Sequence, residues 1–406
     1  MHVSNGVRLP VAAGIVSAAV GLSMVACSGT TTDNGVNETR APKSENNGHS
    51  QAASMMITRG RYLATIGVCE ACHTPPEVPQ TPPDPSDKKQ IARERNFRTD
   101  PDWVKYLDHD RPNAGGVPFV IRLSKDSNAV VYSRNITPDV ETGIGGWSED
   151  DIVKALRTGV TKDGRVLFMF PPHSFYPNLA DDDAYALARY LKSLKPVRHE
   201  IPDRVLPFDP QPAKSDPPEK APGSRDPKRA DYLLSALVGC TECHSHHEGG
   251  TLKKFVGGDP KDATTGVFRF GPDLPLRVNE RGLATFPYPG YAVFYADNLT
   301  KFGVGGPESK TSVKKIMRAF RGGVSPEPDE YGRPRPLNHI MLWQFYSRMS
   351  DDDSYAIARL IKKLRYEPHE VPHGPIYFGE DWRAAFEQVF GEPPSSNDAK
   401  IFGKNP

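Results

Sequence analysis

The sequence predicts a mainly α-helical protein that is built of two tandem helical domains joined by a proline-rich linker. Three observations support this prediction: a long internal repeat, helical spacing of apolar residues inside each copy, and prolines concentrated between the copies. The 406 residues suffice for two or three domains, each with its own core.

The N-terminal segment predicts export. Arg8 precedes the apolar run VAAGIVSAAVGLSMVA, which is too short to span a membrane stably. The run ends at MVAC, which resembles the lipobox of bacterial lipoproteins, so we expect residues 1–27 to be a lipoprotein signal peptide and Cys27 to be lipidated. Cleavage elsewhere, with loss of Cys27, is the alternative. Residues 28–57, which are polar and lack apolar periodicity, are expected to form a flexible tether.

The internal repeat extends from residue 58 to residue 372 and keeps its segments in one order. The matched segments, first copy then second, are RYLATIGVCEACH (61–73) and DYLLSALVGCTECH (231–244), AVVYSRNIT (129–137) and AVFYADNLT (292–300), KALRTGV (154–160) and RAFRGGV (318–324), and DDDAYALARYLKSL (181–194) and DDDSYAIARLIKKL (351–364). We therefore expect two domains, 58–202 and 227–372, called here the first and second repeat. A Pro-rich linker, 203–226, separates them, and a C-terminal tail, 373–406, follows.

Each repeat is expected to begin and end with a helix. Tyr62, Leu63 and Ile66 share one helical face before the first repeated motif. Two capping-box patterns, Ser148 with Asp151 and Ser350 with Asp353, predict helix starts. The terminal helices carry a common stripe that should pack on the first helix of the same repeat; its members are Tyr185, Ala188 and Leu191, and Tyr355, Ala358 and Ile361.

Each repeat contains one C-x-x-C-H motif. The four cysteines beyond Cys27 lie in CEACH and CTECH, which comprise Cys69, Cys72 and His73, and Cys240, Cys243 and His244. This spacing is the attachment signature of haem c, because two thiols one helical turn apart can reach the two vinyl groups of the porphyrin. The histidine that follows then binds the iron from the proximal side. The sequence therefore predicts two covalently attached haem c groups.

Three other interpretations of the cysteines are weaker. Two C-x-x-C pairs could provide four ligands to zinc, but the histidine after each pair would then be a coincidence that occurs twice. A redox disulfide of the thioredoxin kind expects a preceding strand, which neither pair has. A structural disulfide within either pair would close a strained loop.

Residues 58–372 resemble two tandem class I-type cytochrome c domains, and the order of their segments is similar to cytochrome subunits of periplasmic dehydrogenases. The shared order is CxxCH, N-[IL]-T, a GG turn, a helix ending R-x-G-V, a methionine stretch and a terminal helix after an acidic run. The resemblance implies two cytochrome c-like helical haem domains. The first repeat departs from the pattern through a long, Pro-rich stretch that separates Cys69 from Asn135.

The resemblance also implies a methionine on the far side of each iron. In the second repeat this ligand is expected to be Met341, with His339 as the alternative. In the first repeat it is expected to be Met169, with His173 or an open iron as alternatives. Alignment of Tyr176 with Tyr346 places His173 opposite Trp343 and displaces Met169 by two residues, so the Pro-rich loop must absorb a short insertion.

Other repeated polar residues are expected to have structural roles. His246 and His247 could bind a surface metal, but a solvated loop is favoured. His199 and His369 recur before Glu in both repeats and should stabilise the domain end, and Asn135 and Asn298, which begin the two N-x-T segments, should hydrogen-bond near the haem.

These residues predict an electron carrier rather than an enzyme. It would carry electrons between a periplasmic dehydrogenase or another donor and the respiratory chain, with dehydrogenase or oxidase components as partners, from a periplasmic site anchored to a bacterial membrane by lipid. The alternatives are a dihaem enzyme of the cytochrome c peroxidase kind, with one haem site that can open, and a haem sensor or scaffold. Fifty-one basic and 50 acidic residues, without a basic stripe, argue against nucleic acid as a partner.

Overall fold

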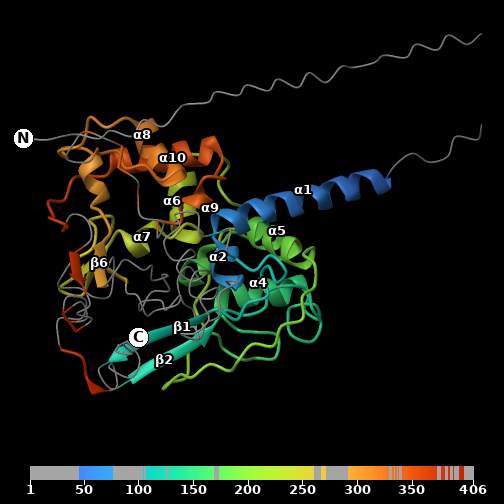
Figure 1. The fold of residues 1–406 in the computed structure, drawn as a ribbon. Coiled ribbons are helices and arrows are strands. Elements are labelled where there is room, and N and C mark those ends of the chain that lie inside the picture. Colours follow the sequence, from blue (N-terminus) through green and yellow to red (C-terminus); the bar gives the residue numbers. More distant parts are fainter. Residues whose placement is uncertain are drawn as a thin grey trace, which may run out of the picture. The chain divides into compact units, whose positions relative to one another are not determined.

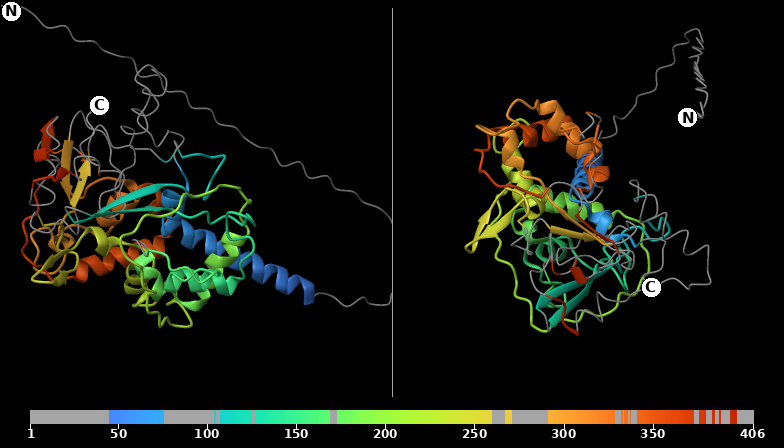
Figure 2. Two further views of the ribbon diagram at one scale, coloured as in Figure 1. Left: turned by 90° about the horizontal axis from the view of Figure 1, so that it is seen from below. Right: turned by 60° about the vertical axis from the view of Figure 1, so that its left-hand side comes forward.

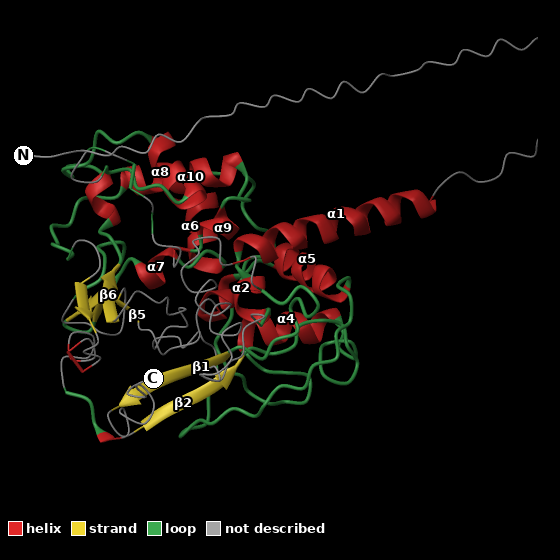
Figure 3. Ribbon diagram, viewed as in Figure 1, coloured by secondary structure: helices red, strands yellow, loops and turns green. Residues whose placement is uncertain are grey.

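The structure is a computed structural model. It describes residues 45–75, 104, 107–124, 127–168, 173–259, 267–270, 291–328, 332, 334–335, 337, 341–372, 376–379, 383–384, 387 and 393–396. These residues form mostly helices with a few short strands, as Figures 1 and 3 show, which confirms the mainly helical prediction. The predicted signal peptide and Cys27 lie outside the described residues, and the account below concerns the unit formed by residues 46–406. None of the helices described is long and apolar enough to cross a membrane.

The first repeat is built mainly of helices and one hairpin. The elements are α1 (Glu45–Ile66), α2 (Cys69–His73), β1 (Pro118–Ser124), β2 (Ser127–Tyr132), α4 (Glu149–Thr158), η2 (His173–Asn178) and α5 (Asp181–Lys192). Strands β1 and β2 pair antiparallel, with Phe119 opposite Val131. Helix α1 begins at Glu45, inside the range expected to be a flexible tether, because the stretch QAASMM that leads into the repeat is rich in good helix formers.

The second repeat has the same helical order with more strands. Its elements are α6 (Arg229–Ala236), α7 (Cys240–Cys243), β3 (His246–Glu248), β4 (Thr251–Lys253), β5 (Val267–Phe270), β6 (Tyr291–Tyr295), η3 (Leu299–Phe302), α8 (Val313–Gly322), α9 (Trp343–Tyr346) and α10 (Asp351–Lys363). The predicted tail supplies β7 (Ile376–Gly379), which pairs with β6 in a sheet of order β5-β6-β7. Helices α8 and α10 lie side by side (Figures 1 and 2).

Helix α4 begins with the capping box that the sequence predicts. The Ser148 hydroxyl accepts from the Asp151 amide at 3.0 Å, and the Asp151 carboxylate accepts from the Ser148 amide at 2.9 Å. The second predicted box, at α10, is only half formed. Ser350 accepts from the Asp353 amide at 3.1 Å, but the Asp353 carboxylate bonds to Tyr62 and Arg229 instead of turning back to the cap.

The first and last helices of each repeat pack together, as the sequence predicts. In the first repeat, Gly60 of α1 lies so close to α5 that an added Cβ would be 2.0 Å from the Ala186 carbonyl oxygen. Helix α6 likewise contacts α10 in the second repeat. Within the predicted stripe Ala188, Leu191, Ala358 and Ile361 are buried, whereas Tyr355 is 51% exposed, so the prediction is wrong for Tyr355.

One hydrophobic core contains residues from both repeats. It includes Leu63 and Ile66 of α1 together with Leu233 and Leu237 at the end of α6, all at most 1% exposed. Gly67 lies against Leu237, since a Cβ added to Gly67 would be 2.8 Å from Leu237 Cδ1. The ends of the two first helices therefore meet where the C-x-x-C-H motifs begin.

The segment between the repeats is hydrogen-bonded to the first repeat at several places. Val205 exchanges two backbone hydrogen bonds of 2.8 Å with Val130 of β2, and the Asp181 amide donates to the Pro218 carbonyl at 3.0 Å. The Ala221 amide donates to the Asp182 carboxylate at 2.9 Å. Residues 203–226 thus run over the surface of the first repeat until α6 begins.

Candidate functional site

Each C-x-x-C-H motif forms one short helical turn directly after the first helix of its repeat. Val68 adopts a left-handed conformation with φ of 54°, which separates α1 from α2 and starts the new turn at Cys69. Burial raises the pKa of Cys69 to about 11 and that of Cys72 to about 12. Both are therefore neutral thiols before any group is attached. The histidine that follows each pair, rather than this protonation state, favours the haem interpretation over the zinc interpretation.

The histidine of each motif is buried and held by one backbone carbonyl. His73 Nδ1 lies 2.6 Å from the Arg134 carbonyl oxygen, and His244 Nδ1 lies 2.8 Å from that of Asp297. A carbonyl can only accept, so Nδ1 carries the proton and Nε2 keeps its lone pair for a metal. Burial lowers the pKa of both histidines, which favours the neutral, metal-binding form.

The carbonyls that hold these histidines directly precede the repeated Asn residues. Asn135 Oδ1 accepts from the Thr137 amide at 3.0 Å, and its Nδ2 donates to the Val197 carbonyl at 2.8 Å. Asn298 repeats this arrangement with the Thr300 amide at 2.9 Å and the Glu367 carbonyl at 3.0 Å. The N-x-T segments therefore connect the backbone that binds each histidine to the end of the same repeat. These are the hydrogen bonds that the sequence predicts for Asn135 and Asn298.

A cavity of about 570 Å³ opens beside His73 and Cys72. Its volume lies within the range of roughly 300–1,000 Å³ typical of cofactor pockets. Its walls are largely apolar; among the lining residues are Phe119, Val131, Ile144, Ile152, Leu156 and Leu191. The cavity thus provides the apolar surroundings that a porphyrin ring requires.

Four cations also line this cavity: Arg134, Lys162, Arg165 and Arg204. The pKa of Arg134 is lowered by burial and further by the positive charges of Arg165 and Arg204, while Asp203 and Asp163 offset part of this effect. A haem carries two propionate carboxylates, which would relieve this repulsion and accept hydrogen bonds from the guanidinium groups. The apolar walls and the cationic residues together fit haem. Sequence reasoning missed these cations because they come from separate segments.

The loop after α8 in the second repeat has the same backbone hydrogen bonds as the loop after α4 in the first. In the first repeat, the Leu167 amide donates to the Gly159 carbonyl at 2.7 Å, and the Thr161 amide donates to the Arg165 carbonyl at 2.9 Å. In the second repeat, the Leu337 amide donates to the Gly323 carbonyl at 2.7 Å, and the Ser325 amide donates to the Arg335 carbonyl at 2.8 Å. Arg335 therefore occupies the place of the cavity-lining Arg165. Arg335 Nε and Trp343 Nε1 are buried nitrogens without a hydrogen-bond partner among the described residues. Each of these donors would be satisfied by an acceptor atom of a bound group.

The predicted sixth ligands are only partly described. Met169 and His339 lie outside the described residues, and for His173 the structure describes the backbone, at the start of η2, but not the side chain. Met341 is partly buried against the shared core, just before α9. Met349 is 1% exposed and packs inside that core. The assignments of Met169 and Met341, with His173 and His339 as alternatives, stay predictions.

The histidines expected to lie outside the haem sites behave differently from one another. His199 Nδ1 lies 3.1 Å from the Ala114 carbonyl oxygen, which supports a structural role. His247 is exposed, as a solvated loop predicts. His246, however, is 4% exposed and stacks on His369 with ring centroids 4.3 Å apart, so the solvated-loop prediction is wrong for His246. The reason is that β3 alternates its side chains, placing His246 inward and His247 outward.

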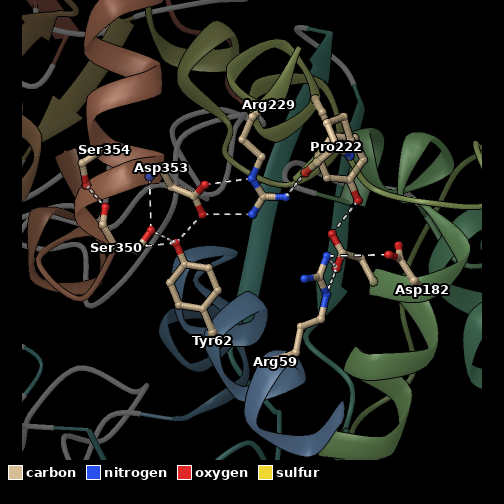
Figure 4. Close-up of polar contacts among 10 residues, drawn as sticks. Arg59, Tyr62, Asp182, Pro222, Arg229, Ser350, Asp353 and Ser354 are labelled. Atoms are coloured by element: carbon tan, nitrogen blue, oxygen red, sulfur yellow. Dashed lines mark hydrogen bonds and ion pairs between the residues drawn. The ribbon is translucent and has the colours of Figure 1, made fainter. Parts of the chain in front are cut away.

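A reciprocal network of Arg, Tyr and Asp joins the two repeats (Figure 4). Within the second repeat, Arg229 binds Asp353 at 2.7 and 2.9 Å, and Arg59 pairs with Asp183 at the equivalent place in the first. Across the repeats, the Tyr62 hydroxyl donates to Asp353 at 2.6 Å and the Tyr232 hydroxyl donates to Asp183 at 2.8 Å. Each aspartate thus binds an Arg of its own repeat and a Tyr of the other.

Two buried tyrosines lie near the cysteines at this interface. Burial raises the pKa of Tyr176 well above its usual value, and Cys69 and Cys72 add to the effect. Burial also raises the pKa of Tyr346, with contributions from Cys240, Cys243 and Cys72. The contact between Gly67 and Leu237, which precede the two motifs, shows that the two candidate haem sites are neighbours.

The protein shows three features that c-type cytochromes have. It is mostly helical, its C-x-x-C-H turns hold buried and oriented histidines, and it has a pocket suited to a porphyrin. Comparison with known proteins agrees. The chain is 29% identical over 224 residues to the cytochrome c subunit of a quinone alcohol dehydrogenase of Gluconobacter oxydans, covering 52% of this chain and 39% of that protein. It is 28% identical over 181 residues to a dihaem c-type cytochrome of Cereibacter sphaeroides, covering 39% and 60%.

A third relative is matched over most of the repeat region. The chain is 26% identical over 336 residues to the gluconate 2-dehydrogenase cytochrome c subunit of Pantoea cypripedii, covering 77% of this chain and 60% of that protein. The predicted similarity to cytochrome subunits of dehydrogenases is thereby confirmed. The chain spans less than two thirds of each of these relatives. No protein-family model matches the chain.

Proposed function

We propose that the protein is a dihaem c-type cytochrome that carries electrons from a dehydrogenase or another donor towards the respiratory chain. The observation that supports this most is the paired arrangement of His73 and His244. Each is buried, follows a C-x-x-C turn and donates its Nδ1 proton to a carbonyl, which leaves Nε2 available to iron. Two relatives are cytochrome c subunits of dehydrogenases, which supports a dehydrogenase as the donor.

In this proposal Cys69 and Cys72 hold one haem through thioether bonds, and Cys240 and Cys243 hold the other. His73 and His244 are the proximal ligands, and Met169 and Met341 are the distal ligands. When bound, haem iron supplies a one-electron couple between its ferrous and ferric forms. The apolar cavity walls would exclude water, and Arg134, Arg165 and Arg204 would be available to bind the propionates of the first haem.

The repeats 58–202 and 227–372 act in this proposal as two haem domains on either side of the Pro-rich segment 203–226. The reciprocal Tyr–Asp bonds and the shared core support a fixed arrangement, rather than a variable separation set by a linker. Since Gly67 and Leu237, which precede the two motifs, are in contact, electron exchange between the two haems is expected to be direct.

We also propose export and lipidation of Cys27, which would place the protein on the periplasmic side of a bacterial membrane. Helix α1 then connects the anchor to the first haem site, because it runs from Glu45 to Ile66 and ends beside Cys69. The anchor would hold the carrier close to membrane-bound electron acceptors.

The proposal is tested on the purified full-length protein. Mass spectrometry after denaturation should find two covalently bound haems, with one lost when Cys69 and Cys72 are both replaced by Ser and the other lost when Cys240 and Cys243 are both replaced by Ser. Magnetic circular dichroism of the oxidised protein should show two low-spin, methionine-ligated haems, of which one signal is lost in Met169→Ala and one in Met341→Ala, with His173→Ala as the control. A high-spin haem together with peroxide turnover would instead favour a peroxidase and overturn the carrier proposal.

A further inference from the structure

Three metal-binding side chains converge in the second repeat, outside both proposed haem sites. His246 lies on β3, Asp259 follows the Gly257-Gly258 turn, and His369 follows α10. Their ligand atoms all lie within 4.8 Å of one another, and His246 Nε2 is 4.0 Å from Asp259 Oδ2. His246 is 4% exposed, so this is a built site rather than a surface coincidence.

Backbone carbonyls fix one ring nitrogen of each imidazole. His246 Nδ1 lies 2.9 Å from the Gly257 carbonyl oxygen, and His369 Nε2 lies 3.1 Å from that of Gly258. Because a carbonyl only accepts, these nitrogens carry the protons, and His246 Nε2 and His369 Nδ1 are left with lone pairs. A metal-binding histidine usually donates its other N–H in this way, to a carbonyl or a carboxylate.

The first repeat lacks this arrangement although its backbone is equivalent. Gly115 donates to the His73 carbonyl at 2.6 Å as Gly257 donates to that of His244 at 3.0 Å, so Pro75 and Val117 stand where the second repeat has His246 and Asp259. His199, the counterpart of His369, has Arg111 Nη1 3.3 Å from its Nε2. The fold therefore does not require a second histidine and an aspartate at these places.

We propose that His246, Asp259 and His369 bind one divalent transition-metal ion, of which Zn²⁺ is the best match. Two imidazole nitrogens and a carboxylate are a recurrent zinc ligand set, and water would complete the coordination. Ligands about 2.1 Å from one ion lie at most about 4.2 Å apart, so small side-chain rotations would bring the three groups to bonding distance. The ion would clamp β3 and the Gly257-Gly258 turn to the chain after α10.

The experiment uses the full-length haem-loaded protein, stripped with a chelator and titrated with Zn²⁺ by calorimetry. One saturable site is expected. His369→Gln and Asp259→Asn should each weaken Zn²⁺ binding by at least about tenfold, whereas His247→Gln, an exposed neighbour on β3, and His199→Gln, the counterpart in the first repeat, should bind as wild type does. An unchanged haem absorption spectrum shows that each variant is folded.

X-ray absorption at the zinc edge gives an independent answer. The proposal requires nitrogen and oxygen neighbours at roughly 2.0–2.2 Å and no sulfur. Zinc bound through sulfur would place it at a C-x-x-C-H motif lacking haem and would overturn the proposal, as would an absence of binding or equal binding by all four variants. These outcomes are separate from the haem content and haem spectra that test the carrier proposal.

Discussion

At the scale of single residues, Gly60 shows how closely the first repeat is packed. Any side chain at this position would meet the Ala186 carbonyl oxygen and the Tyr190 Cβ, at 2.0 and 2.6 Å from an added Cβ. The absence of a side chain therefore sets the distance between α1 and α5. Ala230 stands at the equivalent position of the second repeat, so the contact between α6 and α10 accommodates a methyl group at this place.

Gly60→Ala should destabilise the protein by about 1–3 kcal/mol, because the methyl group forces α1 away from α5 in a well-packed core. Urea unfolding followed by circular dichroism measures the change. Gly146→Ala is the matched control, because a Cβ at Gly146 would meet nothing within 4 Å. Equal changes in the free energy of unfolding for the two substitutions would show that the close approach of α1 and α5 does not contribute to stability.

At the scale of elements, the segment that ends in η3 links the second candidate haem site to the end of its repeat. Asn298 is the N-cap of η3 and accepts from the Thr300 amide, while the residue before it, Asp297, offers its carbonyl to His244. The equivalent segment around Asn135 is placed in the same way by Val197 and Thr137. A substitution of either Asn should therefore alter the orientation of the histidine in the same repeat.

Asn298→Ala should shift the reduction potential of one haem and leave that of the other unchanged, because the carbonyl that orients His244 loses its support. Spectroelectrochemical titration resolves the two potentials. Asn135→Ala should move the other potential, so each variant is the control for its counterpart. A shift of both potentials by either variant, or of neither, would contradict this link between Asn and histidine.

Much of this framework could be predicted from the sequence, because the repeat places equivalent residues in equivalent roles. The C-x-x-C-H turns, the Ser148 capping box and the pairing of first and last helices depend on local spacing. The incomplete box at Ser350 and the burial of His246 could not be predicted in the same way. Each depends on a distant partner, Tyr62 or Arg229 in the first case and His369 in the second, that local spacing does not show.

At the scale of the whole molecule, the interface between the repeats contains two buried carboxylates with opposite titration behaviour. Burial alone would raise the pKa of Asp353, but bonds from Arg229 and Tyr62 outweigh burial and lower it. Burial raises the pKa of Asp183 despite the favourable Arg59 and Tyr232. Asp353 is therefore the member of the pair that stabilises the interface in its charged form.

The contribution of Asp353 should disappear in acid. Because its folded pKa lies below the unfolded value of about 3.9, the stabilisation is fully present above that pH and is lost as the pH falls through the folded pKa. The difference in unfolding free energy between wild type and Asp353→Asn should thus shrink below about pH 4. Urea unfolding at a series of pH values measures it, and Asp352→Asn, at an exposed neighbouring position, is the control. A difference that stays constant with pH would refute the assignment.

The shared core also has a consequence for how the protein is made. Cys69 and Cys72 are partly exposed in the folded protein, and Leu237 of the second repeat packs against Gly67, two residues before Cys69. If these motifs carry haem as proposed, the enzyme that attaches it needs access to thiols that the docked second repeat partly covers. We expect maturation to load both motifs before the repeats dock, so that a cell unable to attach one haem would accumulate an incompletely closed precursor that proteases degrade.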